Sequence, residues 1–225
     1  MGETAPAANL YREHLDRLLS QPTARLIPPP SEAESKRERE RRACEAGTRR
    51  GLPPEHWGDT FGSFDLAVTP GMKTALNAVK RLISMSPGFP QLMLVGPYGI
   101  GKTHLAYAAC NHCRERGWPY RFVRAVELMR ELRRAISRDD ISPEELIGAY
   151  AGNFLLVVDD WGAQQKTAYA EASMYDLLDD RYRLGRPTII TTNCDPEQLD
   201  PRIASRFAAG IIACEGADQR VRFDR

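Results

Sequence analysis

The sequence predicts an α/β fold in which helices cover both faces of a parallel sheet. Short apolar runs of four or five residues alternate with longer segments whose apolar residues recur every three or four positions. Because these short runs lack polar alternation, each is expected to be a strand buried on both faces. A glycine-rich loop also follows one apolar run and precedes a helical pattern, the strand–loop–helix order of such folds. We therefore expect a three-layer sandwich with a central parallel sheet.

The alternation begins near residue 61 and continues to the end of the chain. Helices are expected at 71–84, 102–116, 126–136, 143–151 and 168–184. Strands are expected at 91–95, 121–124, 154–158, 187–191 and 210–214. Proline and glycine mark several boundaries, such as Pro90 before the first strand and Gly96 after it.

The first 50 residues have a different texture. An amphipathic helix is expected at 9–20, a run of three prolines interrupts the chain at 28–30, and a highly charged helix is expected at 31–46. Seven basic and three acidic residues lie between Lys36 and Arg50. Such a stretch is either a solvated helix face or an arm that contacts phosphate or a partner. We expect two parts, a helical arm at 1–50 and one domain at 51–225.

Composition excludes several classes of protein. The 31 basic and 30 acidic residues leave a net charge of +1, so bulk charge cannot hold the whole chain on nucleic acid. Five cysteines form an odd set without a signal peptide, which argues against a disulfide framework and for the cytoplasm. Cys110 and Cys113 are expected on a reduced helix face and not in a metal site, because no second pair follows. No apolar run is long enough to span a membrane.

The strongest motif is a phosphate-binding loop of the form GxxxxGK[ST]. It comprises Gly96, Pro97, Tyr98, Gly99, Ile100, Gly101, Lys102 and Thr103. Its glycines allow backbone N–H groups to approach phosphate closely, and the helix that follows adds its positive N-terminal dipole. The lysine places a positive charge on β- and γ-phosphate oxygens, and the threonine hydroxyl is a ligand for Mg²⁺.

Two carboxylates follow the apolar run at 154–158. A buried parallel strand delivers its last residues to the carboxyl edge of the sheet, where ligands of open α/β folds bind. Asp159 is therefore expected to hold Mg²⁺, directly or through water, and Asp160 to polarise an attacking water molecule. With the phosphate-binding loop upstream, the pair predicts hydrolysis of a nucleoside triphosphate.

Three weaker signals lie further along the chain. Asn193 follows another apolar strand, where its amide could orient the water or contact the γ-phosphate. Arg202 and Arg206 lie four residues apart on one helical face, and a guanidinium that reaches a γ-phosphate from a neighbouring protomer would stabilise transition-state charge. The alternative for these arginines is a surface ion pair. Arg220 offers a further cation near the end of the chain.

In this order, the motifs resemble those of the AAA+ ATPases. More narrowly, they resemble the bacterial helicase loaders DnaC and DnaI, with the transposition ATPase IstB and the initiator DnaA as relatives. The resemblance rests on segments 51–54 (Gly-Leu-Pro-Pro), 61–65 (Phe-Gly-Ser-Phe-Asp), 101–105 (Gly-Lys-Thr-His-Leu), 158–164 (Val-Asp-Asp-Trp-Gly-Ala-Gln) and 202–206 (Arg-Ile-Ala-Ser-Arg). It covers roughly residues 50–225.

The resemblance implies a role for each motif. Lys102 and Thr103 would be the Walker A pair beside His104, Asp159 the Walker B ligand of Mg²⁺, and Asp160 the catalytic carboxylate. Many relatives carry Glu at the position of Asp160, and the shorter side chain implies slow, switch-like hydrolysis of ATP.

The same resemblance covers the later motifs. Asn193 would be the sensor 1 residue, Arg206 an arginine finger acting in trans, and Arg220 the sensor 2 residue. Because the chain ends soon after Arg220, the C-terminal helical lid of the family is expected to be short or absent.

The function implied by the resemblance is ATP-dependent loading of a replicative helicase. ATP would bind at the subunit junctions of a homo-oligomer, and the arm at 1–50 would grip a DnaB-like helicase. Single-stranded DNA is expected on a basic surface of the ATPase domain; alternatively, these arginines only solvate an exposed helix. The arginines concerned are Arg121, Arg124, Arg130, Arg133 and Arg134.

Three alternatives remain at this stage. An IstB-like transposition helper would use the same catalytic motifs to bend duplex DNA and recruit a transposase. A small-molecule P-loop kinase would need an acceptor site and an arginine-rich lid, for which the tail is too short. A nucleotide-gated adaptor would bind ATP with only incidental hydrolysis.

Overall fold

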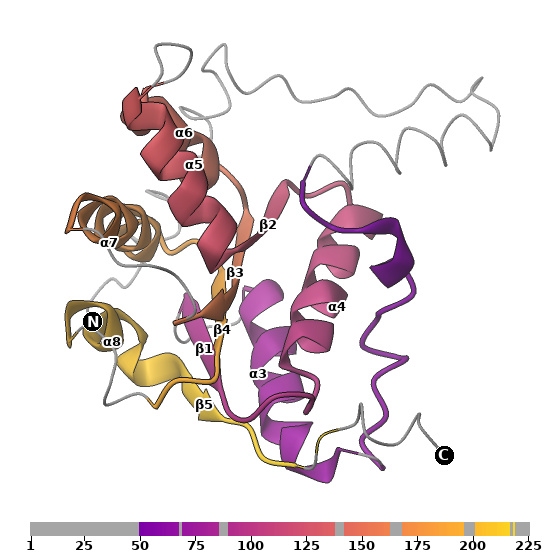
Figure 1. Cartoon of the computed structure of the whole chain (residues 1–225). Coiled ribbons are helices and arrows are strands. Elements are labelled where there is room, and N and C mark those ends of the chain that lie inside the picture. The colour runs from indigo at the N-terminus through magenta and orange to yellow at the C-terminus, as the bar shows by residue number, and fades with distance from the viewer. Residues whose placement is uncertain are drawn as a thin grey trace, which may run out of the picture. The chain divides into compact units, whose positions relative to one another are not determined.

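A computed structural model of the chain describes residues 50–67, 69–85, 90–137, 142–162, 168–195, 201–216 and 218, which are drawn in colour in Figure 1. The helices expected at 9–20 and 31–46 lie outside the described residues, and so does Arg220.

A sheet of parallel strands forms the centre of the described domain. In order along the chain, the strands are β1 (Gln91–Val95), β2 (Tyr120–Arg124), β3 (Leu155–Trp161), β4 (Thr188–Thr192) and β5 (Ile211–Ala213). Within the described residues they lie in the order β2-β3-β4-β1-β5, and every neighbouring pair is parallel. All the strands therefore present their carboxyl ends at the same edge.

Helices form a layer on each face of this sheet (Figure 1). One face is covered by α3 (Lys73–Ile83) and α4 (Lys102–Glu115). The other is covered by α5 (Ala125–Ser137), α6 (Pro143–Ala151), α7 (Ala168–Arg183) and α8 (Pro201–Phe207). Single 3-10 turns lie at Pro54–His56, Pro70–Met72 and Ala208–Gly210. The predicted three-layer α/β fold is confirmed.

Two apolar cores result from the alternation of side chains along the strands. In β3, Leu155 and Val157 pack in the core beneath α3 and α4, whereas Leu156 and Val158 pack in the core on the opposite face. All four side chains are fully buried. Side chains that follow one another in a strand point to opposite faces, so an uninterrupted apolar run is what a two-sided sheet requires.

One strand departs from the expected bounds in a way that matters for the site. The prediction that the strand at 154–158 ends before the two carboxylates is wrong, because β3 continues through both of them to Trp161. Val158 pairs with Ile190 of β4, and Trp161 pairs with Thr192, so β3 contains one extra residue. This irregularity is a β-bulge, a feature that redirects side chains without ending the strand.

Arg181 of α7 ties together the segments that lead into β3 and β4. Its side chain is fully buried, and its guanidinium donates hydrogen bonds to backbone oxygens and one hydroxyl. The acceptors are the carbonyl oxygens of Tyr150, Ala151, Asn153, Phe154 and Pro187 and the hydroxyl oxygen of Thr188. Because a buried guanidinium is costly unless its donors are satisfied, this set of bonds fixes how the two strands begin.

Cys110 and Cys113 lie on the expected helix, α4, where both side chains are fully buried. Burial raises the pKa of both thiols, which favours the neutral, unreactive form. Within the described part of the chain, no group of three or more His, Cys, Asp or Glu residues could hold a metal ion. No described helix combines the length and apolar character needed to cross a membrane.

Candidate active site

The phosphate-binding loop connects the carboxyl end of β1 to the first turn of α4. Gly99 and Gly101 have φ angles of +74° and +101°, in the left-handed region that favours glycine. A Cβ atom at Gly101 would lie 2.9 Å from a ring carbon of Phe64, and one at Gly96 would lie 2.3 Å from the carbonyl oxygen of Cys214. The loop is therefore packed too closely for side chains at these positions, and it leads into a helix N-terminus that attracts anions.

Lys102 is the first residue of α4, and its ammonium group lies over this loop. Its Nζ donates hydrogen bonds to the carbonyl oxygens of Gly96 (2.7 Å) and Pro97 (2.6 Å) and to Oδ1 of Asn193 (2.7 Å). The residue is only 7% exposed. The predicted lysine and the predicted sensor asparagine therefore meet directly, although 91 residues separate them in the sequence.

Asp159 contacts α4 and β4 through a single oxygen. Its Oδ1 accepts hydrogen bonds from the hydroxyl groups of Thr103 (3.0 Å) and Thr191 (2.5 Å). Burial raises the pKa of this carboxyl group, while the two hydroxyl donors and the charge of Lys102 act in the opposite direction. Thr191 is a site residue that the sequence analysis did not single out; its only signal was its position two residues before Asn193.

Asp160 lies in the β-bulge, where it takes a left-handed conformation with φ +59°. In a regular strand its side chain would point to the face opposite that of Asp159. In the bulge its Oδ1 instead accepts a hydrogen bond from Nδ2 of Asn193 (3.2 Å), and its backbone N–H donates to Oγ1 of Thr191 (3.0 Å). An aspartate tolerates this backbone conformation better than most side chains do.

The side chains form one connected network. Asn193 accepts from Lys102 and donates to Asp160, and Thr191 bonds to both Asp159 and Asp160. The Thr103 hydroxyl and the buried Asp159 carboxylate are hard oxygen donors, the ligands that Mg²⁺ prefers. The arrangement thus combines a loop that suits phosphate, a pair of oxygens that suits Mg²⁺ and an exposed carboxylate that can polarise water.

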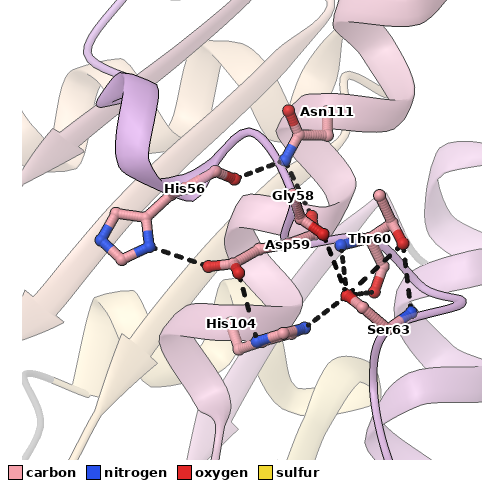
Figure 2. Close-up of polar contacts among 7 residues, drawn as sticks. All are labelled: His56, Gly58, Asp59, Thr60, Ser63, His104 and Asn111. Carbon is pink, nitrogen blue, oxygen red and sulfur yellow. Dashed lines mark hydrogen bonds and ion pairs between the residues drawn. The ribbon is translucent and has the colours of Figure 1, made fainter.

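His104, which the resemblance placed beside the phosphate-binding loop, faces residues 50–67, which we call the lead-in segment (Figure 2). Its Nδ1 lies 3.8 Å from Oδ1 of Asp59, and its Nε2 lies 3.4 Å from Oγ of Ser63. Its ring also meets the ring of Phe64 edge to face, with 5.2 Å between the centroids. His104 therefore links α4 to the lead-in segment.

Further contacts hold the lead-in segment on α4. Nδ2 of Asn111 donates to the carbonyl oxygens of His56 and Asp59, both at 2.8 Å (Figure 2). The ring of His56 stacks on that of Tyr107 at a centroid distance of 4.1 Å. The lead-in segment is thus bonded to the helix that begins at the phosphate-binding loop.

Arg206 lies on α8, and its described partners are on α7. Its Nε and its terminal nitrogen Nη2 each lie 2.7 Å from Oδ1 of Asp179, and Nη2 also donates to the hydroxyl oxygen of Tyr175 at 3.0 Å. None of these partners belongs to the network around Lys102 and Asp159. Action of Arg206 on a neighbouring protomer stays a prediction.

The five arginines expected to bind DNA have different surroundings. Arg121 lies 3.8 Å from Glu131 and donates to the hydroxyl oxygen of Tyr150, and Arg124 forms an ion pair with Glu127. The remaining three are on α5, where Arg130 and Arg134 are exposed and Nε of Arg133 donates to the carbonyl oxygen of Met129. Arg121 and Arg124 thus each have a carboxylate of the same chain beside them, and DNA binding by the five arginines stays a prediction.

Comparisons with known proteins identify relatives of this arrangement. Residues 32–205 match the family described as "IstB-like ATP binding protein". An ATP-binding protein in an insertion sequence of Mycobacterium tuberculosis is 30% identical over 137 residues, which cover 61% of this chain and 54% of that protein. The replicative helicase loader DnaC of Escherichia coli is 27% identical over 173 residues, covering 75% and 70%.

A solved structure shares the fold. The crystal structure of DnaI superposes with a TM-score of 0.62 and 25% identity, covering 72% of this chain and 93% of that one. The match spans little more than half of the insertion-sequence protein but nearly all of the DnaI structure.

Replacing Thr191 by Val should test the bond that orients Asp159. The substitution removes the hydroxyl while keeping the side-chain shape, so one donor to the buried carboxylate is lost. We expect ATP hydrolysis to fall by about tenfold and the Mg²⁺ concentration for half-maximal activity to rise. Titration of turnover with Mg²⁺ provides the measurement.

Thr192→Val is the matched control, because that hydroxyl donates to the carbonyl oxygen of Trp161. It should lower stability without shifting the Mg²⁺ titration. Equal Mg²⁺ titrations for Thr191→Val and wild type would contradict the role given to Thr191.

Proposed function

This chain belongs to the family of IstB-like ATP-binding proteins and is an ATP-hydrolysing AAA+ enzyme, and we propose that it loads a replicative helicase onto DNA. The observation that carries the ATP site is the chain of bonds from Lys102 through Asn193 to Asp160, beside the Thr103–Asp159 pair. In this proposal the ATP site works together with a second protomer, a helicase and single-stranded DNA.

ATP binding begins at the phosphate-binding loop. The backbone N–H groups at the start of α4 bind phosphate oxygens, and Lys102 exchanges the carbonyl oxygens of Gly96 and Pro97 for the more strongly charged oxygens of the nucleotide. Thr103 and Asp159 would hold Mg²⁺, which would supply positive charge to the phosphate oxygens.

Hydrolysis depends on the second carboxylate. Asp160 orients and polarises water, and Asn193 holds this carboxylate at a fixed position relative to Lys102. Because Asp is one methylene shorter than Glu, Asp160 reaches the water less well, and turnover is slow enough for the ATP-bound form to act as a state of its own. The same site thus binds ATP and sets how long the ATP-bound form lasts before hydrolysis.

Arg206 completes the site of the next protomer in a homo-oligomer. Its described bonds are to α7 and lie apart from the network of its own chain, which supports action in trans. A guanidinium supplied in this way stabilises the charge that develops on the transferred phosphoryl group. Hydrolysis then requires assembly.

The N-terminal arm at 1–50 binds the helicase in the cytoplasm, and α5 contributes to a surface for single-stranded DNA. The similarity to DnaC, over three quarters of this chain, supports the loader function. The lead-in segment follows the arm in the chain and is bonded to α4 through Asn111 and His104. These bonds support communication between helicase binding at the arm and ATP binding at the start of α4.

A second candidate function is that of a transposition helper. The family match and the similarity to an insertion-sequence protein favour it, and the catalytic residues would be the same. In that case the chain would act on duplex DNA and recruit a transposase instead of a helicase.

Mixing two inactive variants tests completion of the site in trans. Lys102→Ala cannot bind ATP productively but carries an intact Arg206, whereas Arg206→Ala has the reverse combination. In an equal mixture, about one junction in four joins an intact Lys102 site to an intact Arg206, so we expect about a quarter of wild-type turnover. Each variant alone should be nearly inactive. Normal hydrolysis by Arg206→Ala alone would show that Arg206 does not act as a finger.

DNA binding separates the two candidate functions. A loader should prefer single strands, with an affinity that falls steeply as salt rises, and a transposition helper should prefer duplex. Replacing Arg133 and Arg134 by Gln should reduce the slope of log affinity against log salt by about 1.4 for single strands. Arg124→Gln is the control, since Glu127 already pairs with this arginine. An unchanged slope for the double variant would remove α5 from the DNA surface.

A further inference from the structure

We propose that Asp179 and Tyr175 are positioning residues for Arg206, and that they hold its guanidinium ready for the ATP site of the neighbouring protomer. The inference rests on the proposed function of Arg206 as a finger in trans. It assigns a task in catalysis to two residues of α7 that contact neither ATP nor the site of their own chain.

The first support is the geometry of the bonds to Arg206. Nε and Nη2 both lie 2.7 Å from the same carboxylate oxygen of Asp179, which is a side-on arrangement. Nη2 also donates to the hydroxyl oxygen of Tyr175. Within the described residues the second terminal nitrogen, Nη1, has no hydrogen-bond acceptor, and the side chain is 30% exposed. One edge of the guanidinium is therefore fixed while Nη1 stays available for an external anion.

The second support is that the acceptor is itself held firmly. The Asp179 side chain is only 9% exposed, and its second oxygen lies 2.8 Å from the guanidinium of Arg183. Tyr175, Asp179 and Arg183 follow one another at intervals of four residues, so they share one face of α7. A nearly buried carboxylate with two arginine partners is a far more rigid anchor than a surface carboxylate, which water screens.

The third support comes from the aromatic rings around the guanidinium. The central carbon (Cζ) of Arg206 lies 5.8 Å from the ring centroid of Tyr175 and 5.4 Å from that of Tyr182. The ring of Tyr175 also contacts Arg202. Rings in these positions limit rotation of the guanidinium, so less conformational freedom remains to be lost when it meets phosphate.

Pre-organisation of this kind acts on the reaction more than on binding of ATP. A charged group that is already oriented stabilises the transition state without a cost of rearrangement, and small misplacements lower the rate strongly. A purely structural ion pair would instead affect the stability of its own chain and nothing in its neighbour. The two roles therefore differ in which protomer loses activity.

The test uses Asp179→Asn and Tyr175→Phe, with Tyr182→Phe as the control that leaves the bonds to Arg206 intact. For Asp179→Asn we expect turnover to fall on the order of 10- to 100-fold, and for Tyr175→Phe by about threefold. Affinity for a fluorescent ATP analogue should stay within about twofold for both, because each chain keeps its own ATP site. Tyr182→Phe should hydrolyse ATP at nearly the wild-type rate.

Mixing experiments identify the protomer that is affected. Asp179→Asn should regain turnover when mixed with Lys102→Ala, which supplies an Arg206 held by an intact Asp179. It should gain nothing from Arg206→Ala, because both chains would then lack a functional finger. Loss of turnover that Lys102→Ala cannot restore would show a structural role and overturn the inference.

The outcomes separate this inference from the proposed function. Wild-type turnover in both Asp179→Asn and Tyr175→Phe overturns the positioning role, while recovery of Arg206→Ala by Lys102→Ala would keep the finger. If Arg206→Ala is not restored by Lys102→Ala, the finger itself is excluded. Should Asp179→Asn fail to fold, Tyr175→Phe decides alone, since wild-type turnover in that variant contradicts the proposal.

Discussion

The site depends on the two hydrogen bonds that the side-chain amide of Asn193 makes. It accepts a hydrogen bond from Lys102, which lies over the phosphate-binding loop, and donates one to Asp160, the carboxylate available to polarise water. Lys102 lies on α4 and Asp160 on β3, and the single planar side chain of Asn193, which follows β4, fixes the separation of these two groups. Movement of Lys102 toward phosphate therefore changes the bond between Asn193 and Asp160.

The β-bulge in β3 makes this contact possible. Adjacent carboxylates in a regular strand would point to opposite faces of the sheet, and only one of them could reach the phosphate-binding loop. The extra residue and the left-handed conformation of Asp160 allow Asp159 to meet Thr103 while Asp160 meets Asn193. Burial of Asp159 and exposure of Asp160 then suit one carboxylate to Mg²⁺ and the other to water.

Much of the fold was predictable because its signals are local. A two-sided parallel strand requires an uninterrupted apolar run, and a close turn around phosphate requires glycine, so both are visible in the sequence. The bulge and the role of Thr191 were missed because they depend on the register between β3 and β4. The pairing of Arg206 with Asp179 was missed for a similar reason. The spacing of Arg202 and Arg206 shows that they share one helix face, but it does not show which helix packs against that face.

Separate measurement of ATP affinity and turnover for Asn193→Ala tests the central claim most directly. We expect ATP affinity to stay within about threefold of wild type, because Lys102 and the loop remain. Turnover should fall by about tenfold or more, as expected when a contact that acts in the transition state is lost. A parallel loss of both quantities would show that Asn193 serves only to bind ATP. Wild-type turnover would show that Lys102 and Asp160 act independently.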